Sequence, residues 1–283
     1  MEEKLIKAVG VCGAGTMGSG IAQVAATAGY ATVLYEMNEE VLAKAQDSIA
    51  RSLQIMVEKG KLQPEQKETI YSRIHFSNVV SDCKGDLIIE AIIEKLEAKA
   101  ALFAELAKHN SPQTIFASNT SSLSINEVAK RVQHPGRLAG LHFFNPAPLM
   151  KLVEVVKGEQ TSDEVICSLI ATTTAMGKTP VLCKDAPGFI VNRVARPYYI
   201  EALRLAEAGH DIATIDRLLE SRGFKMGPFK LMDLIGNDIN YAVSCSVYDQ
   251  LNKPERLKPS YIQQQKVENK ELGRKTGKGY YQY

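Results

Sequence analysis

Short apolar runs recur along the first two thirds of the chain, and the longer stretches between them carry apolar residues at helical spacing. The short runs, rich in Val, Ile and Leu, predict strands that are buried on both faces. Alternation of strands and helices is typical of a doubly wound, mostly parallel sheet and places the chain in the α/β class. The strands are predicted at residues 7–12, 31–35, 74–77, 86–90, 114–118, 138–144, 151–156 and 179–183.

One helical stretch is longer than a connection between neighbouring strands requires. Residues 39–72 are helical and heavily charged, with a break near Gly60 and Pro64. This pattern predicts a pair of long helices inserted as a helical hairpin. The remaining helices of this part of the chain are predicted at residues 19–28, 95–108, 124–131 and 162–176.

The pattern changes after Pro187 and Gly188. From there to the end it is helical, with one possible short strand at residues 279–281. We therefore predict an N-terminal α/β domain at residues 1–187 and a smaller, all-α C-terminal domain at residues 188–283.

The composition is that of an ordinary globular protein. The 283 residues are 45% hydrophobic and 23% charged, and 34 basic against 32 acidic residues leave a net charge of +2. This balance disfavours a dedicated nucleic-acid or membrane-surface protein. No signal peptide and no membrane span is evident. The five cysteines are scattered without a Cys-x-x-Cys pair, so we expect no disulfide framework and no metal site, and predict a cytoplasmic protein with reduced thiols.

A glycine-rich loop follows the first predicted strand and opens the first predicted helix. Gly13 can make the tight turn, Gly15 lets the backbone approach a pyrophosphate, and Gly18 lets the helix pack on the strand. Glu36 ends the second strand, where a carboxylate hydrogen-bonds the adenosine ribose and repels the 2′-phosphate of NADP. We therefore predict that residues 1–187 form a Rossmann-type domain that binds NAD. The predicted cofactor-binding residues of the loop are Gly13, Ala14, Gly15, Thr16, Met17 and Gly18.

A glutamate interrupts one of the buried strands. Glu154 lies within the apolar run 152–156, and burying an unpaired carboxylate is costly, so a partner is expected. His142, in the preceding strand, is one candidate, and a lysine is the alternative. The turn at residues 145–148 would let the two strands bring His142 and Glu154 together.

Several motifs carry a resemblance to a known family. "VCGAGTMGSGIAQVAA", "ASNTSSLSI", "GLHFFNPAPLMKLVEVV", "KDAPGFIVNR" and "GRKTGKGYYQY" resemble the L-3-hydroxyacyl-CoA dehydrogenases, in particular stand-alone bacterial members that act on 3-hydroxybutyryl-CoA. The similarity covers essentially the whole chain, and the last four motifs are more specific than the glycine loop. It implies reversible NAD-dependent oxidation of (S)-3-hydroxybutanoyl-CoA, a short-chain (S)-3-hydroxyacyl-CoA, to acetoacetyl-CoA.

The resemblance also implies the catalytic residues. His142 is implied as the general acid/base and Glu154 as its partner, which makes a catalytic metal unnecessary. Ser121 and Asn192 are implied near the oxygen on the substrate's C3 atom, and Ser121 also at the cofactor. A helix cap is the alternative interpretation of Ser121, and a helix-start amide that of Asn192.

Further ligand contacts are implied in the same way. The positions that contact NAD in the family are matched by Glu94, Lys99, Asn145 and Lys275. Ser52 and Lys59, in the helical stretch 39–72, match positions associated with coenzyme A. Solvated surface charges and the wet face of an amphipathic helix are the alternative interpretations.

A homodimer formed through the C-terminal domain is implied as well, with a short-chain acyl-CoA as substrate. Two other functions stay open. One is an enzyme of the same superfamily that prefers NADP or acts on a free hydroxy acid. The other is a nucleotide-binding structural protein related to lens crystallins, against which an intact His142 and Glu154 argue.

Overall fold

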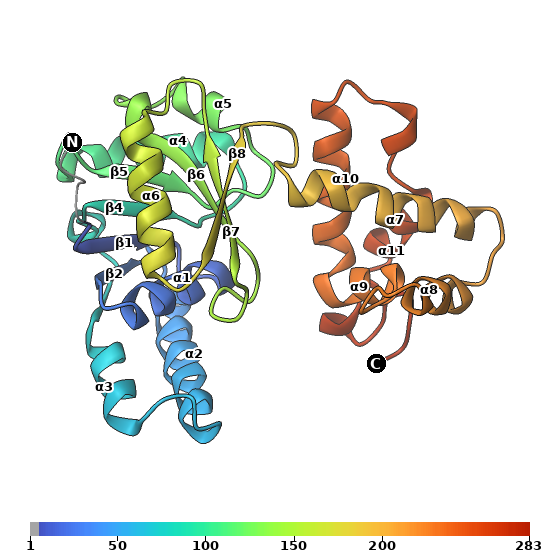
Figure 1. Ribbon diagram of the computed structural model, residues 1–283, viewed down its shortest axis with the longest axis horizontal. Coiled ribbons are helices and arrows are strands. Elements are labelled where there is room, and N and C mark those ends of the chain that lie inside the picture. Colours follow the sequence, from blue (N-terminus) through green and yellow to red (C-terminus); the bar gives the residue numbers. More distant parts are fainter. Residues whose placement is uncertain (1–5) are drawn as a thin grey trace. The chain divides into compact units, whose positions relative to one another are not determined.

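The computed structural model describes residues 6–283, which divide into two compact units (Figure 1). The first unit ends at Asp185, and the second runs from Ala186 to Tyr283. The domain boundary expected after residue 187 lies near this division and stays a prediction. Across residues 6–283, no helix combines the length and apolarity that crossing a membrane requires.

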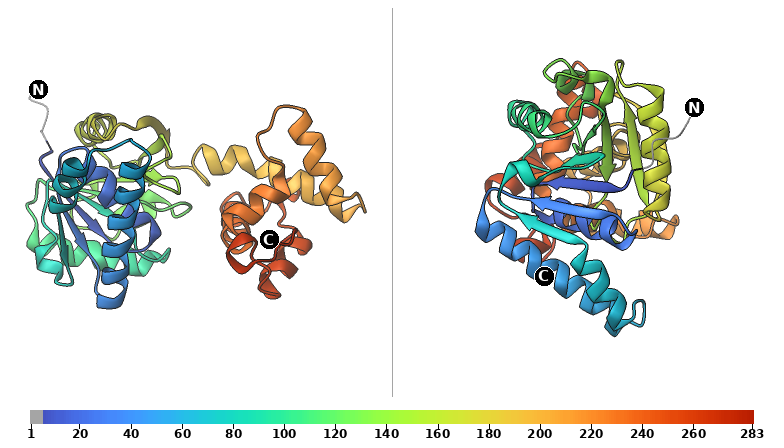
Figure 2. Two further views of the ribbon diagram at one scale, coloured as in Figure 1. Left: turned by 90° about the horizontal axis from the view of Figure 1, so that it is seen from below. Right: turned by 90° about the vertical axis from the view of Figure 1, so that its left-hand side faces the viewer.

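Within the described part of the chain, the first unit contains one sheet of eight strands in the order β3-β2-β1-β4-β5-β6-β7-β8. Neighbouring strands are parallel except for β6 and β7, which are antiparallel. Helices lie on both faces (Figure 2), so the predicted doubly wound α/β architecture is confirmed. The strands are β1 (Ala8–Cys12), β2 (Ala31–Tyr35), β3 (Ile74–Ser77), β4 (Leu87–Glu90), β5 (Ile115–Ser118), β6 (Leu138–Phe143), β7 (Leu152–Lys157) and β8 (Thr179–Lys184).

The central strands are mostly apolar because both faces of the sheet are covered. In β5, Ile115 and Ala117 join a core cluster with side chains of α1 and α6. Phe116 points to the other face, and its ring centroid lies 5.5 Å from that of Phe103 in α4. The helices of this unit are α1 (Thr16–Thr27), α2 (Glu39–Glu58), α3 (Pro64–Ser72), α4 (Leu96–His109), α5 (Ile125–Ala129) and α6 (Asp163–Ala175), with 3-10 turns η1 (Val80–Asp82) and η2 (Pro135–Arg137).

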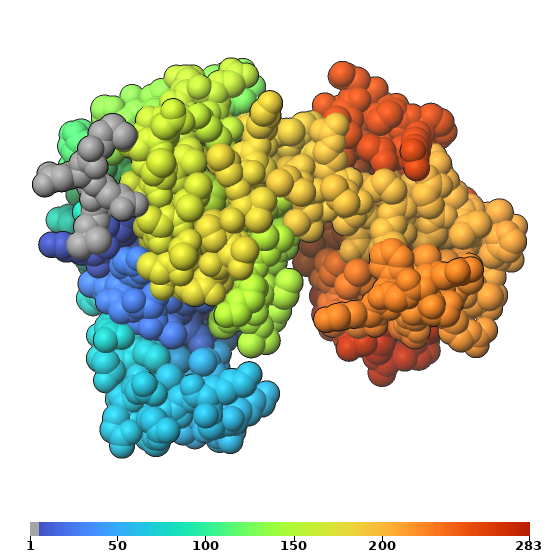
Figure 3. Space-filling model, viewed as in Figure 1, coloured from blue at the N-terminus to red at the C-terminus, as the bar shows by residue number. Residues whose placement is uncertain are grey.

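The helical hairpin predicted at residues 39–72 is confirmed as α2 and α3. The Asn38 side chain caps α2 by accepting the backbone N–H groups of Glu40 and Val41 at 2.9 and 3.2 Å. Pro64 occupies the first position of α3, where its missing N–H group is not needed. The pair protrudes from the rest of the first unit, as its blue and cyan atoms show in Figure 3.

The second unit is helical, as predicted, but residues 279–281 form no strand among the described residues. The backbone N–H groups of Tyr280 and Tyr281 donate to the carboxylate of Asp233 at 2.9 and 3.0 Å, so they are not available to a strand ladder. The helices are α7 (Val191–Glu207), α8 (Ile212–Ser221), α9 (Pro228–Ile235), α10 (Asn237–Gln250) and α11 (Tyr261–Glu268), with 3-10 turns η3 (Glu255–Leu257) and η4 (Arg274–Thr276).

Candidate active site

The glycine loop joins β1 to α1. At two positions, the conformation and packing of the loop backbone leave no room for a side chain. Gly13 has a φ of +95°, a conformation that favours glycine. A Cβ atom on Gly18 would collide with the carbonyl oxygen of Gly13. Gly15, the N-cap of α1, is different, because a Cβ atom there would meet no described atom within 4 Å. The space beside Gly15, at a helix N-terminus that no described side chain caps, fits a phosphate group.

Glu36 follows β2 and faces the glycine loop. Its Oε2 atom accepts the backbone N–H of Ala14 at 3.0 Å, and its Oε1 atom accepts that of Asn38 at 3.1 Å. These bonds hold the carboxylate beside the loop, where it can accept hydrogen bonds from a ribose.

His142 and Glu154 lie opposite each other in the antiparallel pair of β6 and β7. Opposed residues project their side chains to the same face, and His142 Nδ1 lies 2.7 Å from Glu154 Oε2. Glu154 is 0% exposed and His142 is 6% exposed, so this carboxylate is paired with an imidazole. A proton on Nδ1, held by the carboxylate, leaves Nε2 as the ring atom that can accept a second proton. Asn145, in the loop that leaves β6, is exposed.

Glu94 and Ser121, both predicted from the sequence, are in direct contact. Glu94 Oε1 accepts hydrogen bonds from the backbone N–H of Ser121 at 2.8 Å and from its hydroxyl at 3.1 Å. The hydroxyl of Thr120 donates to the same oxygen at 2.7 Å. Burial opposes ionisation of Glu94, but the Lys99 ammonium and these hydrogen bonds lower its pKa below the ordinary value. Glu94 therefore anchors the turn that carries Ser121.

Lys99 is buried beneath this turn, with 1% of its surface exposed. Its Nζ atom lies 2.6 Å from Glu90 Oε1 and 3.2 Å from Glu94 Oε2. The hydroxyl of Ser118 donates to the other oxygen of Glu90 at 2.6 Å. Sequence reasoning missed Glu90, although it gives the same signal as Glu154, an acidic residue in a buried apolar strand. The ammonium of Lys99 joins two carboxylates and holds Glu94 in place.

The other predicted residues lie on different elements. Ser52 is half-buried on α2, and exposed Lys59 follows the last turn of that helix. In the second unit, Asn192 lies in the first turn of α7. Lys275 Nζ bonds both carboxylate oxygens of Asp238, at 2.6 and 2.7 Å.

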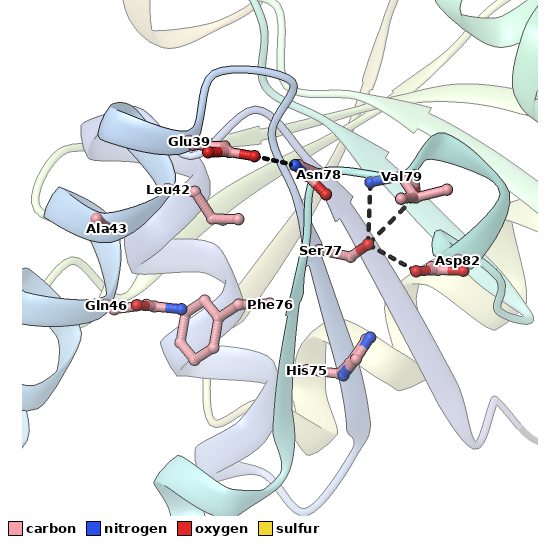
Figure 4. Close-up of a pocket in the computed structure, with 10 residues that line it drawn as sticks. All are labelled: Glu39, Leu42, Ala43, Gln46, His75, Phe76, Ser77, Asn78, Val79 and Asp82. Carbon is pink, nitrogen blue, oxygen red and sulfur yellow. Dashed lines mark hydrogen bonds between the residues drawn. The ribbon is translucent and has the colours of Figure 1, made fainter.

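A surface cavity of about 330 Å³ lies between the start of α2 and strand β3 (Figure 4). Two hydrogen bonds in its wall join polar side chains. The Ser77 hydroxyl donates to Asp82 and the Asn78 amide donates to Glu39, both at 2.7 Å. The predicted site residues are not part of its lining. In the described residues, no three His, Cys, Asp or Glu side chains are grouped to hold a metal ion.

Two family models match the chain. Residues 8–186 match the NAD binding domain of 3-hydroxyacyl-CoA dehydrogenase, and residues 188–283 match the C-terminal domain of 3-hydroxyacyl-CoA dehydrogenase. Together they account for both units of the structure.

Several similar proteins and solved structures are also hydroxyacyl-CoA dehydrogenases by name. The chain is 48% identical to the 3-hydroxyadipyl-CoA dehydrogenase of Escherichia coli K12 over 98% of its own length, but spans only 59% of that protein. It is 43% identical to the mitochondrial hydroxyacyl-coenzyme A dehydrogenase of Sus scrofa, over 99% of the chain and 92% of the relative. The crystal structure of (S)-3-hydroxybutyryl-CoA dehydrogenase from Ralstonia eutropha is similar with a TM-score of 0.93 at 36% identity, covering 99% of both chains.

The different surroundings of Gly15 and Gly18 predict different defects. Gly15→Ala should unfold close to the wild-type temperature but bind NADH at least about tenfold more weakly, because its methyl group fills the space for the pyrophosphate. Gly18→Ala should lose about 1–3 kcal/mol of unfolding free energy through overpacking. Thermal unfolding and NADH fluorescence titration measure both effects. A wild-type Kd for Gly15→Ala would show that the cofactor does not approach this glycine.

Proposed function

The chain belongs to the 3-hydroxyacyl-CoA dehydrogenase family, and from this premise we propose that it catalyses the reversible NAD-dependent oxidation of (S)-3-hydroxybutanoyl-CoA to acetoacetyl-CoA. The observation that carries the proposal is the buried hydrogen bond between His142 and Glu154. It supplies an acid/base within the NAD binding domain, whose glycine loop has room for a phosphate.

In the oxidation, His142 Nε2 takes the proton of the substrate's C3 hydroxyl while the hydride from C3 passes to NAD. The imidazolium that forms is stabilised by Glu154, which also fixes the tautomer of the neutral ring. In the reduction, His142 returns the proton to the oxygen. Ser121, anchored by Glu94, and Asn192 contribute polar groups that stabilise the C3 oxygen as its charge changes.

We infer that NAD binds where the resemblance to the dehydrogenase family predicts. The glycine loop receives the pyrophosphate, and Glu36 receives the adenosine ribose. Lys99 is buried, so it acts through the carboxylate of Glu94. The residues proposed to contact NAD are Gly13, Ala14, Gly15, Thr16, Met17, Gly18, Glu36, Glu94, Ser121, Asn145 and Lys275.

The second unit is proposed to form a homodimer. Several apolar side chains of α9 and α10 are exposed in the single chain, among them Leu234, Ile235 and Ile239. A second copy that covers them would remove apolar surface from water. A molar mass from light scattering at micromolar concentration tests this assembly, and a stable monomer contradicts it.

His142→Gln should lower kcat by a factor of about 10²–10⁴, because the positioned acid/base is lost. Glu154→Gln should also lower kcat, because an amide does not compensate the charge of an imidazolium. NADH affinity should stay near the wild-type value in both variants. Steady-state reduction of acetoacetyl-CoA and an NADH titration measure the two quantities, and a His142→Gln variant with full kcat under chemistry-limited conditions refutes the proton-transfer role.

Wild-type enzyme should oxidise NADH with acetoacetyl-CoA but not with acetoacetate, and should use NADPH poorly because Glu36 opposes a 2′-phosphate. The double variant Glu36→Gln/Met37→Arg should raise kcat/KM for NADPH relative to NADH. Met37→Arg alone is the control, since Met37 is exposed and the variant keeps the carboxylate. A wild-type preference for NADPH would overturn the role of Glu36, and equal activity with free acetoacetate would favour a free hydroxy-acid substrate.

Ser52 and Lys59, on and after α2, are proposed to contact the coenzyme A part of the substrate. Lys59→Ala should raise KM for acetoacetyl-CoA more than for acetoacetyl-pantetheine, which lacks the nucleotide phosphates that a lysine can bind. Exposed Lys44, near the other end of α2, gives the matched control Lys44→Ala. Equal losses of kcat/KM on the two thioesters at low ionic strength would remove Lys59 from the substrate site.

A further inference from the structure

Lys178, a residue that sequence reasoning did not single out, is a buried cation directly before β8. Its surface is 8% exposed, and no carboxylate of residues 6–283 forms an ion pair with it. Its Nζ atom instead donates to the backbone carbonyl oxygens of Ala147 at 2.5 Å and Met150 at 2.9 Å. Burial, and secondarily the nearby charge of Lys151, lowers the pKa of Lys178. Burial of a charged ammonium group costs free energy, which its hydrogen bonds must offset.

Both carbonyl groups belong to the loop 144–151 that joins β6 to β7. This loop connects the strand of His142 to the strand of Glu154, and Asn145 lies within it. Inside the loop, the backbone N–H groups of Leu149 and Met150 both donate to the Pro146 carbonyl at 3.0 Å. Lys178 supplies donors for two carbonyl groups of this loop that turn inward.

The loop also packs against α1, the helix that follows the glycine loop. A Cβ atom on Gly20 of α1 would lie 3.1 Å from Ala147 Cβ and 3.2 Å from Pro148 Cδ, closer than side chains normally pack. The loop therefore contacts both the backbone of α1 and the ammonium of Lys178.

We propose that Lys178 is a positioning residue, which fixes loop 144–151 against α1 and so sets the places of Asn145 and of the His142–Glu154 pair relative to the cofactor. This inference rests on the proposed roles of Asn145 and His142. Lys178 itself touches neither substrate nor cofactor in the proposal, and acts through two carbonyl groups of the loop. A small displacement of that loop is sufficient to lower turnover, because the reacting groups must be held closely in place.

The test compares Lys178→Met, which removes all donors, with Lys178→Gln, whose side chain is about as long as that of Met but keeps an N–H donor group. Lys184→Met is the matched control, because it also removes an ammonium group but exposed Lys184, at the end of β8, lies outside the loop. NADH Kd is measured without acyl-CoA, and kcat and KM with acetoacetyl-CoA, at a temperature at which each variant is folded. We expect Lys178→Met to raise NADH Kd or lower kcat about tenfold or more, Lys178→Gln to be intermediate, and Lys184→Met to stay within about twofold of wild type.

A Lys178→Met variant that unfolds at a lower temperature but keeps the NADH Kd and kcat of the Lys184→Met control would overturn the proposal, because the lysine would then contribute only to stability. If Lys178→Met does not fold, Gly20→Ala replaces it, since the added methyl group would press on Ala147 and Pro148 and displace the same loop. Unchanged NADH Kd and kcat in Gly20→Ala would equally overturn it. Wild-type protein that binds NADH but does not reduce acetoacetyl-CoA would refute the proposed function instead, while the NADH titrations would still decide the role of Lys178.

Discussion

The buried carboxylate of Glu154 constrains how strands β6 and β7 of the first unit pair. It lies in β7, between β6 and β8, and can remain charged there only with a hydrogen-bonding partner. The antiparallel pairing of β6 with β7 supplies that partner, because it places His142 directly opposite. A parallel pairing would require a long crossover connection, whereas an antiparallel pair needs only the short loop 144–151. The burial of Glu154 is therefore linked to three features: the antiparallel direction of β7, the imidazole partner, and the short loop that carries Asn145.

Two buried lysines extend the same principle to the loops around the site. Lys99 is neutralised by Glu90 and Glu94, and Glu94 in turn binds the turn that carries Ser121. Lys178 has carbonyl oxygens as partners and holds the loop after β6. In both cases a charge inside the first unit fixes a loop at the surface. The turn that carries Ser121 and the loop that carries Asn145 thereby gain defined positions without regular secondary structure of their own.

The fold could be predicted well because its signals are local. Apolar runs and helical periodicity marked the strands and helices, and Gly13 and Gly18 marked a turn whose geometry excludes a side chain. The possible strand at 279–281 was the exception. Its N–H groups bond Asp233, which lies 47 residues from Tyr280 in sequence, and no local pattern records such a contact.

By itself, the sequence determined the α/β class, the helical second unit, the glycine loop and the need for a partner of Glu154, because periodicity, backbone sterics and the cost of a buried charge follow from neighbouring residues. The tertiary structure decided which group pairs with each buried charge. In the structure, the partner of Glu154 is His142 and not a lysine. Lys99 forms ion pairs with both Glu90 and Glu94. Lys178 donates to the carbonyl of Ala147, 31 residues away. The physical reason is that these partners come from segments that only strand order and register bring within hydrogen-bonding distance.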